Sequence, residues 1–458
     1  MTELKIDSLA PAAQQLLKSM STGYAIGGTD QEGAAALRIE DLDNDIKRLT
    51  ATNADFTILG LINRKRVTST AHQYPIKDQI GGSIFESFVS EPSLAPIEDP
   101  HFAQKVVNMK YVSQSRQTTM ASLIVNNIAD LMAQLQEDAT MAAGLAIEYG
   151  IFYGDSSLSG ESATQGLQFD GLAKLIDPKN VLDAGGESLT EKWLNKAAAI
   201  IGEAGFGRPT HAFTTVSVQA DFDNQQLDRQ RALISTPEGV ATGFNVRVFN
   251  STRGAIALEN STIMDAADKF VAKPLSKNSP APATVTGEVV ANANGHFQDK
   301  DVATQNYRVV VWSNAGRSAS TDASAALDKV TSAVKLTVKI PLISASAPQF
   351  VEVFRQAEDG NYYAITRQGL YQAENDGTQL TLSITDDNSR IPGTSDVFVG
   401  SLEPQTTELL ELLPLSRIEL PQFTNTKAFS TIWMGALALY APKRWVRITN
   451  VAKVHTNV

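Results

Sequence analysis

Apolar residues recur at helical spacing over one long stretch of the chain. Between residues 130 and 153 they are separated by steps of three and four. The apolar side chains concerned are Leu135, Ala139, Ala142, Ala146, Tyr149 and Phe152. This spacing predicts a single helix with these side chains on one face, and Gly154 is a usual C-terminal stop for it.

The segment that follows mixes helical and extended patterns, which is typical of an α+β domain. Thr190 is placed to cap a helix that runs through Ala204, with Leu194, Ala198 and Ile201 on one face. "HAFTTVSV" predicts a strand, "VQADFDNQQLDRQRALI" a helix, and "FNVRVFNS" and "GAIALEN" two further strands.

A change in composition marks the start of a second kind of domain. The stretch "KPLSKNSPAPATV", from Lys273 to Val285, contains three prolines and indicates a linker. Beyond it, "VKLTVKIP" and "LTLSITDD" alternate apolar and polar residues, and "NYRVVVW", "QFVEVFRQ" and "YYAIT" supply further strands. This pattern predicts a β-sandwich over residues 276–396, of immunoglobulin or fibronectin-III type but without an inter-sheet disulfide.

The last segment, residues 397–458, returns to the first pattern. "TELLELLPL" is leucine-rich, and "AFSTIWMGALALYAPKRWVRITNV" predicts two strands joined at Ala441-Pro442. The sandwich is therefore predicted to be an insertion in an α+β domain that begins before it and is completed after it.

The region before the long helix predicts extended arms. In residues 51–118, "RKRVTSTAHQYPI" and "FAQKVVNMKYVSQSRQ" alternate apolar and polar residues but carry too few apolar side chains for a core of their own. Such an arm would be stabilised by lying on another subunit. Residues 1–50, with glycines at positions 23, 27, 28 and 33, predict a second, flexible arm.

Composition excludes several classes of function. The 458 residues carry a net charge of -11, which argues against tight binding of nucleic acid over the whole surface. The absence of cysteine excludes disulfides, thiolate metal sites and cysteine nucleophiles. The five histidines are scattered, so we expect no clustered zinc site. Lacking an apolar segment of signal-peptide or membrane-spanning length, the protein is expected to fold in a cytosol without membrane contact.

The block "GDSSL", residues 154–158, looks like the nucleophile block of a serine esterase. Such an enzyme needs its serine after a strand and a later Asp-x-x-His. Here Ser156 and Ser157 follow a predicted helix, and Asp-x-x-His never occurs. We interpret the block as a turn in which Asp155 accepts local backbone N–H groups, and expect no catalytic residue.

Three other motifs resemble ligand sites but depart from them. The aspartates of "EDLDND" have calcium-loop spacing, but Ile46 and Thr52 replace the required glycine and glutamate. "GEAGFG", residues 202–207, lies at a predicted helix end, whereas phosphate cradles lie at helix starts. "APKRWVRI" could touch nucleic acid, although its alternation favours a strand with a charged face. We expect no cofactor or metal, and the lack of catalytic motifs favours a structural or binding protein.

Long blocks of the sequence resemble one family. They are "MKYVSQSRQTTMASLIVNNIAD", "EYGIFYGDSSL", "GLQFDGLAKLID", "SLTEKWLNKAAAIIGEAGFG", "GVATGFNVRVFNSTRGAIALENSTIM", "DVFVGSLEPQTTELLELLPL" and "WMGALALYAPKRWVRITNV". In this order they closely resemble major capsid proteins of large contractile-tailed phages of Gram-positive bacteria, the Twort-like and related groups. The resemblance covers nearly the whole sequence, including the predicted sandwich.

The resemblance implies the Hong Kong ninety-seven-type capsid fold. On that fold the segments would be an N-terminal arm (1–50), the E-loop region (51–118), the spine helix and peripheral domain (119–170), the axial domain (171–275), an outward-facing immunoglobulin-like insertion (276–396) and the C-terminal return (397–458).

The same resemblance implies partners and a location. The protein would assemble with itself into pentamers and hexamers of an icosahedral shell, with scaffold and portal proteins present during assembly. Double-stranded DNA would be enclosed by proximity rather than by specific binding, and the protein would reside in the virion. Related proteins often lose an N-terminal piece to a protease, and "LLKSMSTGYA" makes Lys18–Ser19 the candidate cleavage point. Some members join a lysine to an asparagine covalently. Lys77 lies in the arm, but no partner is identifiable, so no crosslink is predicted.

Two other functions stay open at this point. An adhesin-like protein would use the sandwich to recognise a glycan or a cell surface, and this role could coexist with a shell. An encapsulin would use the same fold in a cellular compartment, but encapsulins usually lack such an insertion.

Overall fold

The computed structural model describes residues 55–79, 81, 88–91, 93–94, 98–124, 130–159, 166–226, 234–236, 239–241, 246–266, 268–292, 295–342, 344–421 and 425–453. The "EDLDND" motif and the Lys18–Ser19 candidate lie outside these residues. None of the helices within the described ranges has the length and apolar content needed to cross a lipid bilayer.

The predicted long helix is present as α4, Leu131–Tyr153. Its buried face differs from the predicted one. Ala139, Ala143, Ile147 and Ile151 are buried at steps of four, whereas Ala146 is exposed. Small and apolar residues occur on most faces of this helix, so its hydrophobic pattern does not single out one face. The elements that pack against the helix therefore determine which face is buried.

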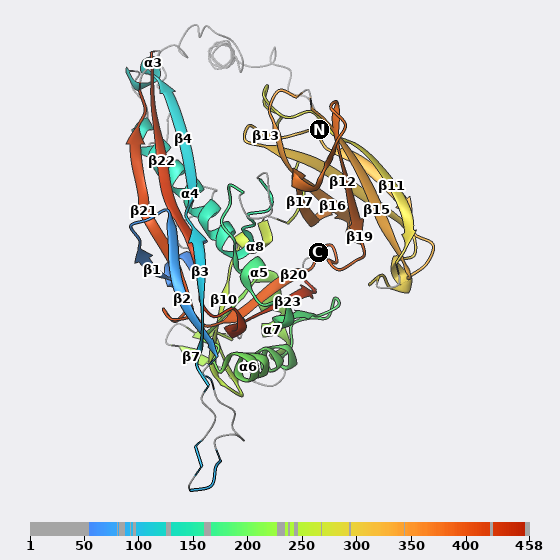
Figure 1. The fold of residues 1–458 in the computed structure, drawn as a ribbon. Coiled ribbons are helices and arrows are strands. Elements are labelled where there is room, and N and C mark those ends of the chain that lie inside the picture. The colour runs from blue at the N-terminus through green and yellow to red at the C-terminus, as the bar shows by residue number, and fades with distance from the viewer. Residues whose placement is uncertain are drawn as a thin grey trace, which may run out of the picture. The chain divides into compact units, whose positions relative to one another are not determined.

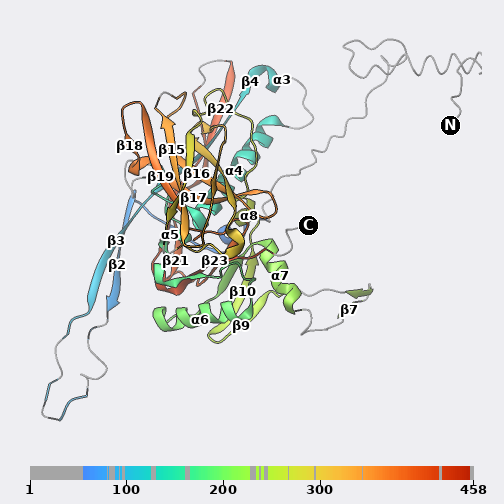
Figure 2. The same ribbon diagram turned by 90° about the vertical axis from the view of Figure 1, so that its right-hand side faces the viewer.

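A four-stranded sheet combines strands from both ends of the sequence. In spatial order it consists of β1 (Asn63–Arg66), β21 (Thr407–Glu419), β22 (Thr426–Leu439) and β4 (Lys110–Thr119). Figure 1 shows β4 and β21 on either side of β22. The prediction of a coreless arm over all of residues 51–118 is therefore wrong for β1 and β4, because both pair with the C-terminal strands. What remains as an arm is the ribbon of β2 (Ala71–Gln79) and β3 (His101–Asn108), seen in Figure 2.

A six-stranded sheet forms the centre of the second part of the α+β domain. Its order is β5 (Val181–Asp183), β23 (Trp445–Val451), β20 (Ser395–Gly400), β6 (His211–Thr214), β10 (Gly254–Asn260) and β9 (Val248–Ser251). Helix α6 (Glu191–Gly205) packs Leu194, Ala198 and Ile201 against this sheet, as its spacing predicted.

One predicted strand of this sheet is too long. "HAFTTVSV" is a strand only as far as Thr214, and α7 (Val216–Gln226) begins two residues later. The hydroxyl of Thr215 accepts the backbone N–H of Val218 at 3.5 Å, as in a helix N-cap. The β-branched residues here favour a strand, but the N-cap hydrogen bond of Thr215 stabilises the start of a helix instead.

Shorter elements complete the α+β domain. They are α2 (Ile58–Leu61), α3 (Met120–Ile124), α5 (Leu172–Leu175), α8 (Ile263–Ala266), β7 (Ile234–Thr236), β8 (Gly239–Ala241), η4 (Pro178–Asn180) and η7 (Pro442–Arg444).

The predicted β-sandwich is present as two antiparallel sheets. One is ordered β11 (Thr284–Ala291), β15 (Ser332–Pro341), β19 (Gln379–Asp386), β18 (Glu374–Asn375). The other is ordered β13 (Gly316–Arg317), β12 (Thr304–Ser313), β16 (Pro348–Gln356), β17 (Tyr362–Gly369), with β14 (Thr321–Ala326) also paired to β12. Helices η5 (Asp299–Asp301) and η6 (Leu370–Gln372) lie between strands. Val309, Leu336, Val351 and Leu382 from both sheets share one core.

The order of the sandwich strands can be compared with that of an immunoglobulin domain. If β11, β12, β14, β15, β16 and β17 are taken as strands B, C, C′, E, F and G, their order in the sequence and their neighbours in the sheets both agree with that domain. The difference lies in β18 and β19, which come last in the sandwich, with β19 beside β15 in the position of strand D.

Both ends of the insertion differ from the predicted boundaries. The sandwich strands end at Asp386, and Asp396, the predicted last residue, lies on β20 in the six-stranded sheet. At the other end, the predicted linker is preceded by a segment that runs along β17. Lys269 forms an antiparallel bridge with Tyr363, and the N–H of Phe270 donates to the Tyr362 carbonyl at 2.8 Å. This segment covers an otherwise open sheet edge.

Candidate functional site

The "GDSSL" block forms a turn after α4, as its sequence predicted. One carboxylate oxygen of Asp155 accepts the backbone N–H of Ser157 at 2.8 Å, the Ser157 hydroxyl at 2.7 Å and the Lys174 ammonium at 2.6 Å. Burial tends to raise the pKa of Asp155, but the hydrogen bonds from Lys174 and Ser157 outweigh it and hold the pKa below its usual value. Asp155 is therefore a charged anchor of the turn.

The geometry around Ser156 does not suit a nucleophile. Ser156 is 3% exposed, and its hydroxyl accepts the Lys174 ammonium at 3.0 Å. Burial tends to lower the pKa of Lys174, but its hydrogen bonds to Asp155 and Asp170 outweigh this effect. The pKa of Lys174 is therefore above its usual value. A protonated ammonium cannot take the hydroxyl proton, so Lys174 cannot serve as a general base.

The "GEAGFG" and "APKRWVRI" motifs contact each other, and their hydrogen bonds stabilise the fold. Helix α6 ends at Gly205, followed by Phe206 in the left-handed conformation at φ 50°. The Arg444 guanidinium donates to the Gly205 carbonyl at 3.1 Å, which places a cation at the helix C-terminus. Trp445 is completely buried, and its indole N–H donates to the Thr407 hydroxyl at 2.8 Å. The predicted C-cap and turn of "GEAGFG" and the predicted strand in "WVRI" are confirmed. The charged face predicted for that strand is wrong, because Lys443 and Arg444 lie before it in η7 and Arg447 is paired with Asp396.

A cluster of buried polar groups connects α4, the segment before the linker, the sandwich and the six-stranded sheet. Its members are Tyr149, Asp268, Glu352, Arg367, Arg390, Asp396 and Arg447, and we call it the ionic joint. Asp396, with no exposed surface, accepts Arg447 at 2.7 Å and is also paired with Arg390. Asp268 lies 3.4 Å from Arg390 and 3.8 Å from Arg367.

The joint reaches the sandwich through Arg367 on β17. The Arg367 Nε donates to a Glu352 carboxylate oxygen at 2.7 Å, and its guanidinium carbon stands 5.6 Å from the centre of the Tyr149 ring on α4. The joint therefore ties the inserted sandwich to the long helix through paired charges and one cation–π contact.

The two aspartates of the joint differ in electrostatics. Burial tends to raise the pKa of Asp396, but Arg390 and Arg447 outweigh it, so the pKa lies below its usual value. For Asp268 burial is the larger effect, and the pKa is raised despite Arg390 and Arg367. Burial also raises the pKa of Tyr149 to about 12. The groups of the ionic joint are suited to holding parts of the fold together. Separately, no three Asp, Glu or His side chains in the described ranges lie closely enough to bind a metal ion.

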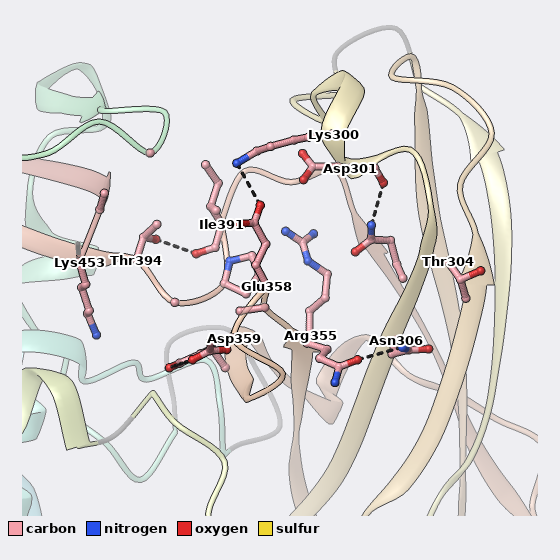
Figure 3. A pocket seen from close by; sticks show the side chains of 18 residues that line it. Lys300, Asp301, Thr304, Asn306, Arg355, Glu358, Asp359, Ile391, Thr394 and Lys453 are labelled. Atoms are coloured by element: carbon pink, nitrogen blue, oxygen red, sulfur yellow. Dashed lines mark hydrogen bonds and ion pairs between the residues drawn. The ribbon is translucent and has the colours of Figure 1, made fainter. Parts of the chain in front are cut away.

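A polar cavity of about 370 Å³ is shown in Figure 3. Its wall includes three cationic side chains, each with an acidic partner. Lys300 is 3.5 Å from Glu358, Arg355 is paired with Asp386 at 2.5 Å, and Lys453 is paired with Asp265. The cations of this cavity are thus compensated, and Asp301 and Asp359 add further acidic side chains to its wall. We call it the polar cavity.

The β2–β3 ribbon exposes apolar side chains. Phe102 is 62% exposed and Val106 is 52% exposed, both on β3. The Lys77 ammonium on β2 stands 5.9 Å from the centre of the Phe102 ring. A two-stranded ribbon without a core is marginally stable by itself, so exposed apolar groups on it indicate a surface that is covered by something else.

Sequence reasoning missed the ionic joint. Its members come from five separate parts of the sequence, and no motif spacing unites them. A weaker signal was present: Glu352, Asp396 and Arg447 are charges inside the otherwise apolar strands "QFVEVFRQ", "DVFVG" and "WVRI". Charged residues are seldom fully buried unless they are paired, so a charge at such a position predicts a partner.

No protein-family model matches this chain. It is 43% identical over 445 residues to a major capsid protein of Staphylococcus phage K, covering 96% of this chain and 95% of that protein. It is 42% identical over 454 residues to a relative from Enterococcus phage phiEF24C, covering 98% and 97%. Among solved structures, the capsid of a native GTA particle matches with a TM-score of 0.47 at 7% identity, covering 92% and 97%. The capsid of Myoviridae Phage XM1 matches with a TM-score of 0.45 at 8% identity, covering 93% and 100%. These two structural scores are too low to support an argument.

Proposed function

This chain belongs to the family of phage major capsid proteins, and from that premise we propose that it builds its shell by laying the β2–β3 ribbon on a neighbouring copy. Its role is structural, and its place is the virion capsid. The alternatives of a free-standing adhesin and an encapsulin are not favoured, because the similar proteins are phage capsid proteins over nearly the whole length.

The exposed ribbon is the observation that supports this proposal. Phe102 and Val106 keep more than half of their surface in contact with solvent. Burying one such side chain on a neighbour would contribute about 1.5–3 kcal/mol before the cost of ordering the ribbon. Because every copy carries the same ribbon, a shell of many copies would repeat this contact around each ring of subunits.

The other segments are assigned on the same premise. The ribbon would be the E-loop of a Hong Kong ninety-seven-type fold, α4 its spine helix, and the six-stranded sheet with α6 and α7 the axial domain. The sandwich would face outward. Pentamers and hexamers of this protein would form an icosahedral shell, with scaffold and portal proteins as assembly partners and double-stranded DNA enclosed without specific contacts. The wall's net charge of -11 suits a container that releases its DNA.

Charge substitutions on the ribbon test the proposal. Phe102→Asp combined with Val106→Asp should leave a soluble, folded subunit that forms no closed shells when it is expressed with its scaffold and viewed by electron microscopy. The matched control is Val302→Asp, an apolar residue of the sandwich that is 38% exposed and should still give shells. Shells at the normal yield from the double variant would refute the proposal.

Processing at Lys18–Ser19 is proposed on the same premise and is tested separately. N-terminal sequencing of subunits from mature virions should begin at Ser19. A sequence that begins at Met1 or Thr2 would exclude cleavage.

A further inference from the structure

A second cavity, of about 320 Å³, opens beside the ionic joint. Four aromatic side chains line it: Tyr149, Trp312, Phe350 and Phe354. Gln168, Glu352 and several cationic side chains complete the wall. We call it the aromatic cavity.

The aromatic side of the cavity contains a stacked pair of rings. Trp312 on β12 and Phe350 on β16 are cross-strand partners, with ring centres 5.9 Å apart and planes at 11°. Both side chains are half-buried, while Phe354 behind them is 3% exposed. A stacked pair of this kind offers a rigid surface at little cost in side-chain entropy.

The cationic side carries charge that no close ion pair compensates. Lys269, Lys273 and Arg317 line the cavity, and none of the ion pairs within the described parts of the protein involves any of them. Lys269 has a longer-range electrostatic interaction with Asp359. Arg317 donates to the Val271 carbonyl and stands 4.9 Å from the centre of the Phe270 ring. Burial lowers the pKa of Arg317, and the charge of Glu352 offsets this effect only in part.

The one carboxylate in the wall does not cancel these charges. Glu352 is 5% exposed and already accepts Arg367 at 2.7 Å and the Trp312 indole N–H at 2.7 Å. Arg367 thus neutralises Glu352, and the other three cations leave a positive field. The polar cavity differs on this point, because its three cations have acidic partners.

We infer that the aromatic cavity binds an acidic sugar, a ring that carries a carboxylate or a phosphate, as a unit of a glycan outside the shell. The anionic group would pair with Arg317 and the two lysines, and the apolar face of the ring would pack on Trp312 and Phe350. Remaining lone pairs of Glu352 and the amide of Gln168 are suited to sugar hydroxyls. An aromatic acid would satisfy the wall and the cations but offers few hydroxyl donors to Glu352.

This inference rests on the proposed function, because a glycan reaches the cavity only if the sandwich faces outward. The subunit itself should bind whether or not it assembles. Failure of binding and failure of assembly are therefore separate results: shells without binding overturn the inference alone, and a subunit that binds but forms no shells overturns the proposed function alone.

Tryptophan fluorescence provides a direct measurement. Trp312 is half-buried at the cavity, whereas Trp193, Trp433 and Trp445 are at most 7% exposed. Glucuronic acid and glucose 1-phosphate should each give a saturable change in emission, and glucose should give none. The Trp312→Phe variant should lose the signal, while calorimetry should still detect binding.

Charge variants identify the site. Lys273→Met, at an exposed position, and Arg317→Met should each weaken binding of the acidic sugars at least several-fold, and Arg317→Lys should recover part of the loss. The matched control is Lys339→Met on β15 of the other sheet, which should bind normally. The inference is overturned if neither acidic sugar binds, if Lys273→Met and Arg317→Met bind as the parent does, or if benzoate or inorganic phosphate binds as tightly as the sugars.

Discussion

Arg447 on β23 holds the carboxylate of Asp396 on β20 with two hydrogen bonds, at 3.2 Å from Nε and 2.7 Å from Nη2. The two strands are neighbours in the six-stranded sheet. β20 is the first strand after the sandwich, so this pair, together with Arg390, secures the point where the backbone returns from the insertion.

Replacing Asp396 by Asn should be strongly destabilising. The change leaves the guanidinium groups of Arg390 and Arg447 buried without their shared counter-charge, and breaking such a pair costs about 3–5 kcal/mol. Chemical denaturation of the subunit would measure this loss. The matched control is Asp322→Asn, because Asp322 is 62% exposed in its pair with Arg308 and its loss should cost about 0–1 kcal/mol. Equal effects of the two substitutions would contradict a special role for the joint.

The contribution of Asp396 should depend on pH. Its folded-state pKa lies below the ordinary value of 3.8, so the stabilisation is present above that value and is lost as the pH falls through the folded-state pKa. The difference in unfolding free energy between the parent and D396N should therefore be constant near neutral pH and shrink in acid. Measuring this difference cancels the opposite trend expected from Asp268, whose pKa is raised. If the difference in unfolding free energy between the parent and D396N grows in acid, the pKa of Asp396 is not lowered in the folded state.

The turn after α4 should tolerate loss of its serines but not of its glycine. A side chain at Gly154 would place Cβ 2.5 Å from the Gly150 carbonyl oxygen and against the Phe169 carbonyl, both backbone groups. Gly154→Val should therefore cost about 3 kcal/mol or more and reduce assembly. Ser157→Ala removes the hydroxyl hydrogen bond to Asp155 but keeps the one from the backbone N–H, so it should cost about 0.5–1.5 kcal/mol, and shells should still form. Thermal denaturation and electron microscopy would compare the two variants.

Phe270 should anchor the segment that enters the sandwich. Its ring lies 5.2 Å from the Phe354 ring and beneath the guanidinium groups of Arg308 and Arg317. Phe270→Ala should release this segment from the β17 edge and speed tryptic cleavage after Lys269 and Lys277. Phe88→Ala is the control, because Phe88 is 83% exposed and its loss should leave these cleavage rates unchanged. Unchanged cleavage in F270A would show that the backbone bridge at Lys269 is sufficient.

Local periodicity predicted most of the elements. The helical spacing of residues 130–153 produced α4, and the alternation in "VKLTVKIP" and "LTLSITDD" produced β15 and β19. These patterns suffice because the side-chain period of a helix or strand is a property of consecutive residues. The absence of an Asp-x-x-His motif likewise argued from the sequence alone against Ser156 as a nucleophile.

The pairing of strands that are distant in the sequence could not be predicted from the sequence alone. No local pattern indicates that β1 and β4 join the C-terminal strands, or that β12 pairs with β16 while β15 pairs with β19. Strand pairing is decided by which faces bury together, and α4 shows the same dependence: its alanines and glycines allow several buried faces, and tertiary packing selects Ala139, Ala143, Ile147 and Ile151.

The sequence by itself therefore determined the element types, the presence of an inserted β-sandwich and the resemblance to phage major capsid proteins. The tertiary structure decided the ionic joint and the aromatic cavity. The reason is physical: Asp396 and Arg390 are close in sequence, but Arg447, Asp268 and Arg367 reach the same buried site only after three separate strand and linker pairings have formed. Buried charges are stable where partners converge, and that convergence exists only in three dimensions.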